Sequence, residues 1–424
     1  MQNPIFDQLD RRGLVAQSTD REALSRHLEQ GPVTYYCGFD PSAPSLHIGN
    51  LVQILTLRRL QQAGHHPLAL VGGATGLIGD PKMTGERTLN APDTVAGWVG
   101  RIRAQIEPLL DFEGPFKARM VNNLDWTSGL SAIDLLRGVG QHFRLGSMLA
   151  KETVARRLAS DQGISYTEFS YQVLQAMDFL ELNRRYGCTL QTGGNDQWGN
   201  LLGGVELIHK AAGRTVHAFT TPLITKADGT KFGKTESGTV WLDPAMTTPY
   251  AFYQFWLNQD DRDAPGYLGV FTFRPLEEIA ALAAATADRP QDRAAQRALA
   301  WDVTALVHGE RAAQQAQGAA AALFGGASLA SLEVGTLEAA VAELPRAQVG
   351  GAGGDWSVVG ALTASGLEKS RGAARRTLAA GGVYLNNVKV AGEDAALEPA
   401  DFLHGRFALL RRGRKTLAAI ELER

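Results

Sequence analysis

A strand, a helix and a second strand follow one another within about forty residues near the N-terminus, and this order strongly constrains the fold. Residues 33–39 (VTYYCGF) are β-branched and aromatic, which is typical of a strand. Apolar residues recur at helical spacing from Leu46 to Ala63, and Gly64 stands where such a helix would end. Residues 67–71 (PLALV) are continuously apolar, as in a strand buried on both faces. This unit predicts a parallel sheet with helices on its faces, an α/β fold.

The composition is that of an ordinary globular protein. The chain has 424 residues, of which 44% are hydrophobic, so we expect two or three domains with separate cores. The formal net charge of −2 excludes nucleic-acid binding through bulk positive charge, although a local basic patch remains possible. The two cysteines exclude a disulfide framework, and without a CxxC pair we expect no metal site. The sequence has no secretion signal or membrane span, so we expect a cytoplasmic protein without membrane association.

The first polar segment whose side chains are suited to catalysis or binding is 40–50 (DPSAPSLHIGN), between the first strand and its helix. A helix N-terminus offers free N–H groups and a partial positive charge to a phosphate. His47 and Asn50 are three residues apart and can both donate hydrogen bonds there, while Gly49 would let a flat ring lie against the backbone. Taken alone, this segment fits a polar helix start as well as it fits a phosphate site.

A second segment, 225–238, carries Lys231 and Lys234 among glycines. Such a loop can close over a triphosphate and neutralise the leaving pyrophosphate, but taken alone it fits an exposed turn better. It is not a P-loop, because only three residues separate Gly229 and Gly233. The glycine-rich segment 72–80 does not match GxGxxG either, which argues against an NAD-dependent oxidoreductase.

A third set of polar residues has helical spacing. Tyr171, Gln175 and Asp178 stand at i, i+4 and i+7, which places them on one helical stripe among apolar residues. Buried polar groups need partners, so a polar ligand is one interpretation and a solvent-facing stripe is the other. The loop 193–199 (GGNDQWG) can bring Asp196 and Gln197 against the same ligand.

Together these segments resemble the bacterial tyrosyl-tRNA synthetases, a family of class I aminoacyl-tRNA synthetases, over essentially the whole chain. The motifs that carry the resemblance are 36–41 (YCGFDP), 47–50 (HIGN), 71–81, 171–178, 194–199 and 231–235 (KFGKT). The resemblance implies a Rossmann-like catalytic domain with a parallel sheet, then a helical domain on the anticodon side and a small α+β S4-like RNA-binding domain. The implied boundaries are 1–240 for the catalytic domain, 241–345 for the helical domain, 346–355 for a glycine-rich linker and 356–424 for the S4-like domain.

The implied activity is that of a tyrosine–tRNA ligase. L-Tyrosine would react with ATP to give tyrosyl-adenylate and pyrophosphate, and the tyrosyl group would pass to the 3′ end of tRNA(Tyr). ATP would be a substrate accompanied by Mg²⁺, no tightly bound cofactor is implied, and the family forms homodimers. A tryptophanyl-type synthetase and a catalytically inactive RNA-binding relative are the alternatives. Tyr36 and Asp178 favour a phenol over an indole, and the intact lysines and His47 favour catalysis.

The resemblance also implies roles for single residues. Stabilisation of the transition state is implied for His47, Asn50, Lys231, Lys234 and Thr235. Tyrosine binding is implied for Tyr36, Asp80, Tyr171, Gln175, Asp178 and Gln197. ATP binding is implied for Cys37, Asp40, Ser42, His47, Gly49, Gly194, Asp196 and Lys234. No side chain has to attack, because the tyrosine carboxylate is the nucleophile, and the reaction depends on positioning and charge stabilisation.

Four features depart from the family pattern, and one of them is a loop that often reads IGGSDQ, in which Thr192 and Asn195 vary here. Asn50 stands where a second histidine is common, and Ser42 replaces a common threonine but keeps the hydroxyl. The loop 81–87 is shorter than usual, which leaves open whether Lys82 or Arg87 contacts phosphate.

The C-terminal segment is locally basic. From residue 366 onward eleven Lys and Arg stand against seven Asp and Glu, a local charge of +4. This asymmetry is expected where phosphates bind, although a solvated basic helix would show it too. RNA binding is expected for Lys369, Arg371, Arg375, Arg376, Arg411, Arg412, Arg414 and Lys415. A hairpin is expected around Asn386 and Asn387.

Overall fold

The computed structural model describes residues 4–83, 85–230, 232–235, 238–325, 328–350, 355–413 and 416–423. Two compact units divide the chain, the first made of Met1–Met246 and Asp260–Ala295, the second of Thr247–Gln259 and Gln296–Arg424. The range 241–345, expected as one helical domain, is therefore shared between the two units. No helix in the described part of the chain has an apolar stretch long enough to cross a bilayer.

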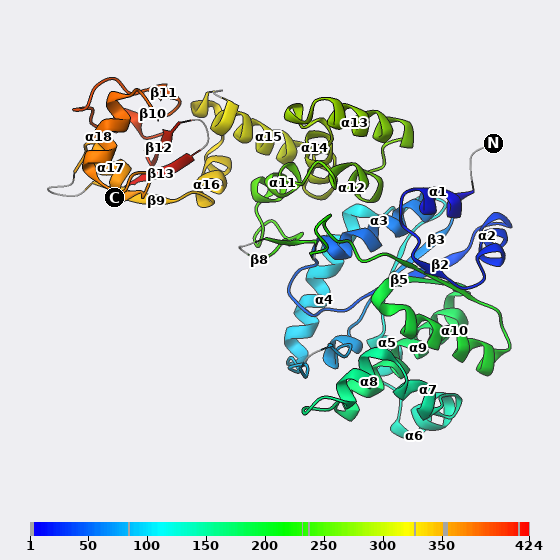
Figure 1. Ribbon diagram of the computed structural model, residues 1–424. Helices are drawn as coiled ribbons and strands as arrows, with labels where there is room; N and C mark the ends of the chain where they lie inside the picture. Colours follow the sequence, from blue (N-terminus) through cyan, green and yellow to red (C-terminus); the bar gives the residue numbers. More distant parts are fainter. Residues whose placement is uncertain are drawn as a thin grey trace. The chain divides into compact units, whose positions relative to one another are not determined.

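The first unit contains a six-stranded sheet in the order β1-β6-β5-β2-β3-β4 (Figure 1). Its strands are β1 (Gln17–Ser18), β2 (Thr34–Phe39), β3 (His66–Val71), β4 (Arg119–Asn122), β5 (Leu190–Gly194) and β6 (His217–Thr221). All neighbours are parallel except β1, which pairs antiparallel with β6. The order of strands reverses between β2 and β5. The carboxyl ends of these two strands are therefore the edge where an open α/β sheet binds ligands.

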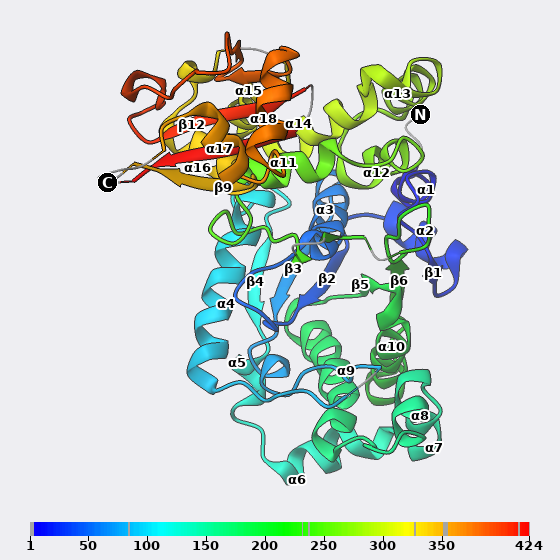
Figure 2. The same cartoon turned by 60° about the vertical axis from the view of Figure 1, so that its left-hand side comes forward.

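Alternation along β2 decides which helix covers which face. Tyr36 packs against Phe179 of α9 (Tyr166–Tyr186), with 5.3 Å between ring centroids. The neighbouring Tyr35 points the other way and donates a hydrogen bond of 2.5 Å to the Leu57 carbonyl of α3 (Ile48–Gln62). Figure 2 shows α3 on one side of the strands and α9 with α10 (Trp198–Ala212) on the other. The predicted strand–helix–strand unit over 33–71 is confirmed by β2, α3 and β3.

Nine further α-helices among the described residues complete the first unit. They are α1 (Ile5–Arg11), α2 (Arg21–Glu29), α4 (Pro92–Ile106), α5 (Leu124–Thr127), α6 (Ala132–Asp134), α7 (Leu145–Leu149), α8 (Glu152–Leu158), α12 (Ala264–Phe271) and α13 (Leu276–Asp288). Arg12 and the buried Arg59 of α3 both donate to the Gly269 carbonyl near the end of α12, at 3.3 and 3.1 Å. Cations at the carbonyl end of a helix are favourable, which explains why 260–295 belongs with the sheet.

The second unit combines helices with a five-stranded sheet. Its helices are α11 (Pro249–Leu257), α14 (Ala294–His308), α15 (Glu310–Gly325), α16 (Val334–Ala342), α17 (Val358–Ala364) and α18 (Arg371–Ala379). Its strands, in the order β11-β10-β12-β13-β9, are β11 (Val388–Lys389), β10 (Val383–Leu385), β12 (Phe407–Arg412), β13 (Thr416–Leu422) and β9 (Arg346–Val349).

Two local features of the second unit bear on the sequence predictions. Asn386 and Asn387 both have positive φ, 47° and 69°, as a two-residue hairpin turn between β10 and β11 requires. In the segment 346–355, expected to be a linker, the first four residues instead form β9, which pairs in parallel with β13. Four residues that alternate between polar and apolar are too few to predict a strand beside a run of glycines. Only their pairing with the distant β13 makes them a strand. Residues 351–354 lie outside the described part of the chain.

Candidate active site

At one end of the site the buried carboxylate of Asp178 meets two donors. It accepts hydrogen bonds from Asn123 Nδ2 at 3.0 Å and from Trp126 Nε1 at 2.9 Å, and burial raises its pKa to about 7. The buried Tyr36 hydroxyl has no hydrogen-bond partner among the described residues. Burial, and then the charge of Asp178, raises the pKa of Tyr36. A buried hydroxyl without a partner is costly, so this end of the site is suited to a ligand that supplies one.

A chain of hydrogen bonds leads from Asp178 to the carboxyl end of β2. Asn123 Nδ2 also donates to Thr75 Oγ1 at 2.9 Å, and Thr75 Oγ1 donates to Asp40 Oδ1 at 2.6 Å. The Tyr171 hydroxyl donates to Asp40 Oδ2 at 2.6 Å. Sequence reasoning missed Thr75, Asn123 and Trp126. The available signal was their place after β3 and β4, since the carboxyl ends of parallel strands share one edge.

A second carboxylate, Asp80, lies in an amide network. It accepts from Gln197 Nε2 at 2.8 Å and from Asn200 Nδ2 at 3.2 Å, and Asn200 Nδ2 also donates to Gln197 Oε1 at 3.1 Å. Burial raises the pKa of Asp80 to about 6, so it is ionised at neutral pH. Gln175 Oε1 is buried and has no partner among the described residues. Asp196 is exposed beside Gln197. The predicted Asp80 and Gln197 are thus in direct contact, which suits an ammonium ligand.

The N-terminus of α3 is built as a reciprocal cap. His47 is the N-cap residue, and its Nδ1 accepts from the Gly49 N–H at 3.0 Å. Asn50 Oδ1 accepts from the His47 N–H at 3.1 Å. Because Nδ1 is an acceptor, neutral His47 carries its proton on Nε2, and Asn50 keeps its amide hydrogens for other partners. A Cβ at Gly49 would lie 2.8 Å from His47 Cε1, so the glycine also makes room for the cap itself.

The remaining predicted nucleotide ligands lie around the same edge. Cys37 is a buried thiol on β2 whose pKa burial raises to about 12, so it is not a nucleophile. Ser42 is exposed, and its N–H donates to the Asp40 carbonyl at 2.8 Å. Gly194 ends β5, where a Cβ would lie 2.6 Å from Asp196 Oδ1. The backbone thus turns tightly at the carboxyl ends of β2 and β5, between which the order of strands reverses.

The lysine loop is described only in part. Lys231 lies outside the described residues, and Lys234 and Thr235 form strand β7 (Lys234–Thr235), which pairs with β8 (Gly238–Thr239). At the base of the loop, the Phe232 ring lies 4.5 Å from the Tyr267 ring of α12, between centroids.

The short loop 81–87 is held by a buried ion pair. Arg157 and Glu168 are 2.9 Å apart and almost completely buried. Arg157 Nη1 donates to the Gly85 carbonyl at 2.6 Å, and Glu168 Oε1 accepts from the Arg87 N–H at 2.6 Å. Arg87 Nε donates to the Asp80 carbonyl at 2.7 Å. Arg87 is therefore used to shape the backbone beside Asp80.

The predicted RNA-binding residues that the structure describes lie on α18, just before it, and on β12. Lys369, Arg375 and Arg376 are exposed, whereas Arg371 pairs with Asp355 at 2.5 Å. Arg412 pairs with Glu368 at 3.4 Å, and Arg411 lies 4.0 Å above the Tyr384 ring. Arg414 and Lys415 lie outside the described residues.

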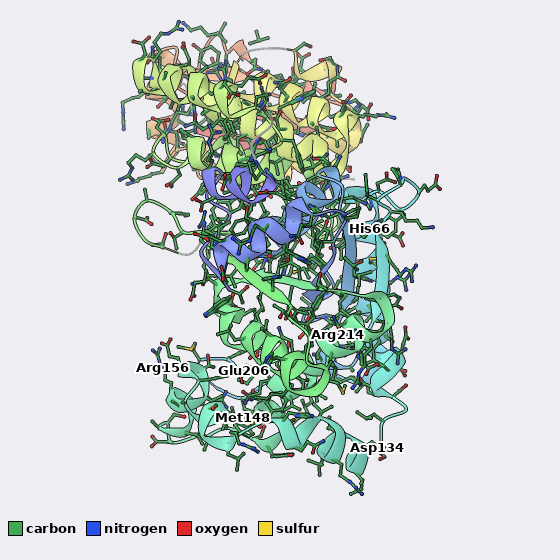
Figure 3. The ribbon with its side chains drawn as sticks, turned by 90° about the vertical axis from the view of Figure 1, so that its right-hand side faces the viewer. His66, Asp134, Met148, Arg156, Glu206 and Arg214 are labelled. Atoms are coloured by element: carbon green, nitrogen blue, oxygen red, sulfur yellow. The ribbon has the colours of Figure 1, made fainter. Side chains whose placement is uncertain are left out.

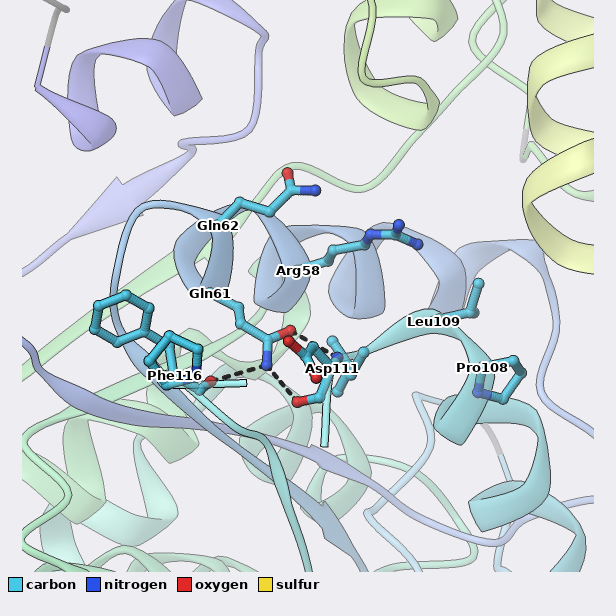
Figure 4. A pocket seen from close by; sticks show the side chains of 9 residues that line it. Arg58, Gln61, Gln62, Pro108, Leu109, Asp111 and Phe116 are labelled. Carbon is cyan, nitrogen blue, oxygen red and sulfur yellow. Dashed lines mark hydrogen bonds between the residues drawn. The ribbon is translucent and has the colours of Figure 1, made fainter. Parts of the chain in front are cut away.

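A cavity of about 370 Å³ lies elsewhere in the first unit, between the C-terminal end of α3 and the segment 108–116 (Figure 4). Gln61 closes part of it by donating to the carbonyls of Asp111 and Phe116, at 2.6 and 2.9 Å. None of the predicted site residues lines this cavity.

Comparison with known proteins covers nearly the whole chain. Residues 28–325 match the family described as tRNA synthetases class I (W and Y), and residues 336–420 match the tyrosine–tRNA ligase SYY-like C-terminal domain. The chain is 64% identical over 419 residues to a tyrosine–tRNA ligase of Streptomyces avermitilis, covering 99% of each chain. It is 54% identical over 423 residues to one of Mycobacterium tuberculosis, again covering 99% of each.

A solved structure with a similar fold is the C-terminally truncated mitochondrial tyrosyl-tRNA synthetase of Coccidioides posadasii. Its TM-score is 0.66 at 33% identity, covering 74% of this chain and 91% of that chain. Tyrosyl-tRNA synthetase from Archaeoglobus fulgidus shares the fold at 16% identity, with a TM-score of 0.54. With the buried Tyr36 and Asp178 at one end of the site, the capped helix at the other and these relatives over the whole chain, the chain belongs to the tyrosyl-tRNA synthetases, within the class I aminoacyl-tRNA synthetases.

Proposed function

We propose that this protein is a tyrosine–tRNA ligase, which activates L-tyrosine with ATP and then esterifies the 3′ end of tRNA(Tyr). The observation that carries the proposal is the buried Tyr36 hydroxyl, which has no partner among the described residues, together with the carboxylate of Asp178. A phenol can accept from Tyr36 and donate to Asp178 at the same time. An indole N–H can only donate, so tryptophan would leave Tyr36 unpaired.

The other end of the amino acid would lie among the polar groups around Asp80. Its ammonium would meet the Asp80 carboxylate, the Tyr171 hydroxyl and Gln175, whose Oε1 is an unused acceptor. Gln197 would donate to the amino-acid carboxyl. These assignments place one end of the substrate at Asp178 and its reacting carboxylate toward the carboxyl ends of β2 and β5.

ATP, accompanied by Mg²⁺, would lie along the edge formed by β2, α3 and β5. The groups proposed to contact its ribose and adenine are Cys37, Asp40, Ser42, Gly49, Gly194 and Asp196. The carboxylate oxygen of tyrosine attacks the α-phosphorus, and the bond to pyrophosphate breaks. His47 Nε2–H and Asn50 would donate to the phosphates, while Lys231 and Lys234 would neutralise the departing pyrophosphate and the Thr235 hydroxyl would donate a hydrogen bond to it. In the second step the terminal ribose hydroxyl of the tRNA attacks the activated carbonyl, and AMP leaves.

The second unit is proposed to bind the tRNA. Lys369, Arg375 and Arg376 are exposed cations on α18 and just before it, and among the described residues they form no ion pair with a carboxylate. They would therefore be available to contact RNA phosphates. Arg411, stacked on Tyr384, offers a flat cationic surface beside them. Arg371 and Arg412 are paired with carboxylates and would have to exchange these partners for phosphate.

A homodimer in the cytoplasm is the proposed working form. Several large apolar side chains between α5 and α7 are exposed in the single chain, namely Leu124, Ile133, Leu136, Leu145 and Leu149. Exposed apolar side chains favour burial against another protein surface, and a second copy of the chain is the partner that the family implies.

Pyrophosphate exchange into ATP, measured with each amino acid separately, tests the activity. We expect exchange with tyrosine and background rates with tryptophan and phenylalanine. Equal exchange with tryptophan would contradict the assignment, and no exchange with any amino acid would favour a catalytically inactive RNA-binding relative.

A further inference from the structure

Lys151 lies just before α8, and its side chain runs across the first turns of α10. Gly199 and Gly203 are four residues apart and share one face of that helix. A Cβ at Gly199 would lie 3.7 Å from Lys151 Cδ, and one at Gly203 would lie 3.9 Å from Lys151 Nζ. Figure 3 shows the same neighbourhood, with Met148 of α7 and Glu206 of α10 labelled. The two glycines therefore leave a path for a lysine side chain to cross the helix.

The end of this side chain joins the network around Asp80. Lys151 Nζ donates to Asn200 Oδ1 at 3.2 Å, and Asn200 Nδ2 donates to Asp80 Oδ1 at 3.2 Å. The cation polarises the amide, and the polarised amide is a stronger donor to the carboxylate. The other carboxylate oxygen accepts from Gln197 at 2.8 Å. Both oxygens of Asp80 are thus held in place, one of them through Asn200 by Lys151.

We propose that Lys151 is a positioning residue for amino-acid activation: through Asn200 it orients the Asp80 carboxylate and keeps it ionised for the substrate ammonium. Lys151 itself does not touch the substrate. The inference rests on the proposed function, because Asp80 meets an ammonium only if an amino acid binds there.

The charges around the pair define a pH window. Burial raises the pKa of Asp80 to about 6, and Asp40 and Asp196 raise it as well, while its amide donors lower it. Burial lowers the pKa of Lys151 to about 8, against the raising effect of Asp80 and Glu206. Since electrostatic coupling is reciprocal, the cation that Asp80 stabilises also favours ionised Asp80. Tyr171 is the further titratable group that the charge of Asp80 influences.

Between these two pKa values Asp80 is ionised and Lys151 is protonated. Below about pH 6 Asp80 takes up a proton and loses its attraction for an ammonium. Above about pH 8 Lys151 loses its charge and no longer assists Asp80. Removal of the lysine charge should therefore matter most at pH 6.5 and little at pH 8.5.

The test is tyrosine-dependent pyrophosphate exchange by the full-length chain, without tRNA, so that an RNA contact of Lys151 does not enter. We compare wild type, Lys151→Met and Lys151→Arg with Lys117→Met, which changes an exposed lysine outside this network. For Lys151→Met we expect the tyrosine KM to rise about fivefold at pH 6.5 and less than twofold at pH 8.5. The kcat and the KM for ATP should change less than twofold. Lys151→Arg should keep most of the wild-type dependence of KM on pH, and Lys117→Met should keep all of it.

If the tyrosine KM of Lys151→Met exceeds that of wild type by the same factor at every pH, the proposal is overturned, because a merely structural lysine would give that result. An unchanged KM would overturn it too. If Lys151→Met does not fold, Asn200→Ala interrupts the same chain and must reproduce the pH-dependent rise in KM. Failure of the proposed function is a separate outcome, since wild-type protein would then show no tyrosine-dependent exchange at any pH.

Discussion

The two ends of the site are built in opposite ways. Around Asp178 the groups are side chains of the core, the carboxylate is 2% exposed, and two donors hold it before any ligand binds. Around His47 the groups are an exposed helix cap and a loop, and the donors in the two hydrogen bonds of the cap are backbone N–H groups. A phenol must be told apart from close analogues, which requires dry and fixed partners. A triphosphate carries enough charge to be held by an exposed and adaptable site.

The largest effect is expected at the phosphate end. Lys231→Ala and Lys234→Ala should each slow adenylate formation by about 100-fold, because the charge they neutralise develops as pyrophosphate departs. Tyrosine binding should stay within about twofold, since the other end of the site is prebuilt. Single-turnover kinetics and equilibrium tyrosine binding separate the two effects. A parallel loss of binding would mean that the two ends are not independent.

At the phenol end, Asp178→Ala should mainly reduce selectivity. Loss of one buried hydrogen bond to a charged group costs about 1.5–3 kcal/mol, or about 10- to 100-fold in the ratio of tyrosine to phenylalanine kcat/KM. Asp178→Asn keeps an acceptor oxygen but not the charge. Its ratio of tyrosine to phenylalanine kcat/KM should therefore lie between those of wild type and Asp178→Ala. If the ratio is unchanged in both variants, Asp178 does not meet the phenol.

Removal of the C-terminal sheet should distinguish amino-acid activation, which uses both ends of the site, from RNA binding. We expect a chain ending at Pro345, before β9, to keep pyrophosphate exchange within about twofold and to lose about tenfold in tRNA aminoacylation, with a flatter salt dependence. An endpoint at Val349 is less suitable, because it would leave β9 without β13. Full aminoacylation by the shorter chain would show that the basic residues are merely solvated. Loss of both activities would show that the parts do not fold independently.

The smallest effect is expected from Trp126→Phe, which removes one donor from Asp178 and keeps the ring. A net loss of about 1 kcal/mol corresponds to about fivefold in the tyrosine-to-phenylalanine ratio. Trp356→Phe in the second unit is the matched control and should leave the tyrosine-to-phenylalanine ratio unchanged. An effect in the control as large as in Trp126→Phe would indicate general destabilisation instead of a specific contact.

Local patterns predicted the parts of the site that lie close together in sequence. The stripe of Tyr171 and Asp178 follows from helical spacing, and α9 carries both on its buried side. The cap of α3 follows from a polar helix start, although its reciprocal form, with Gly49 making room for the His47 ring, was not foreseen. Predictions for Lys231, Arg414 and Lys415 lie outside the described residues and stay predictions.

The amino-acid sequence alone is therefore enough to predict the strand–helix–strand unit, the helices with their polar stripes, and the turn at Asn386 and Asn387. Only the tertiary structure placed Asn123 and Trp126 on Asp178, or Lys151 on Asn200. The physical reason is the distance along the chain between the residues that make each contact. A helix, a cap or a two-residue turn is decided by neighbours along the chain, through backbone periodicity and local hydrogen bonds. A contact between residues about fifty positions apart depends on strand order and on which helix covers which face, and no single segment contains that information.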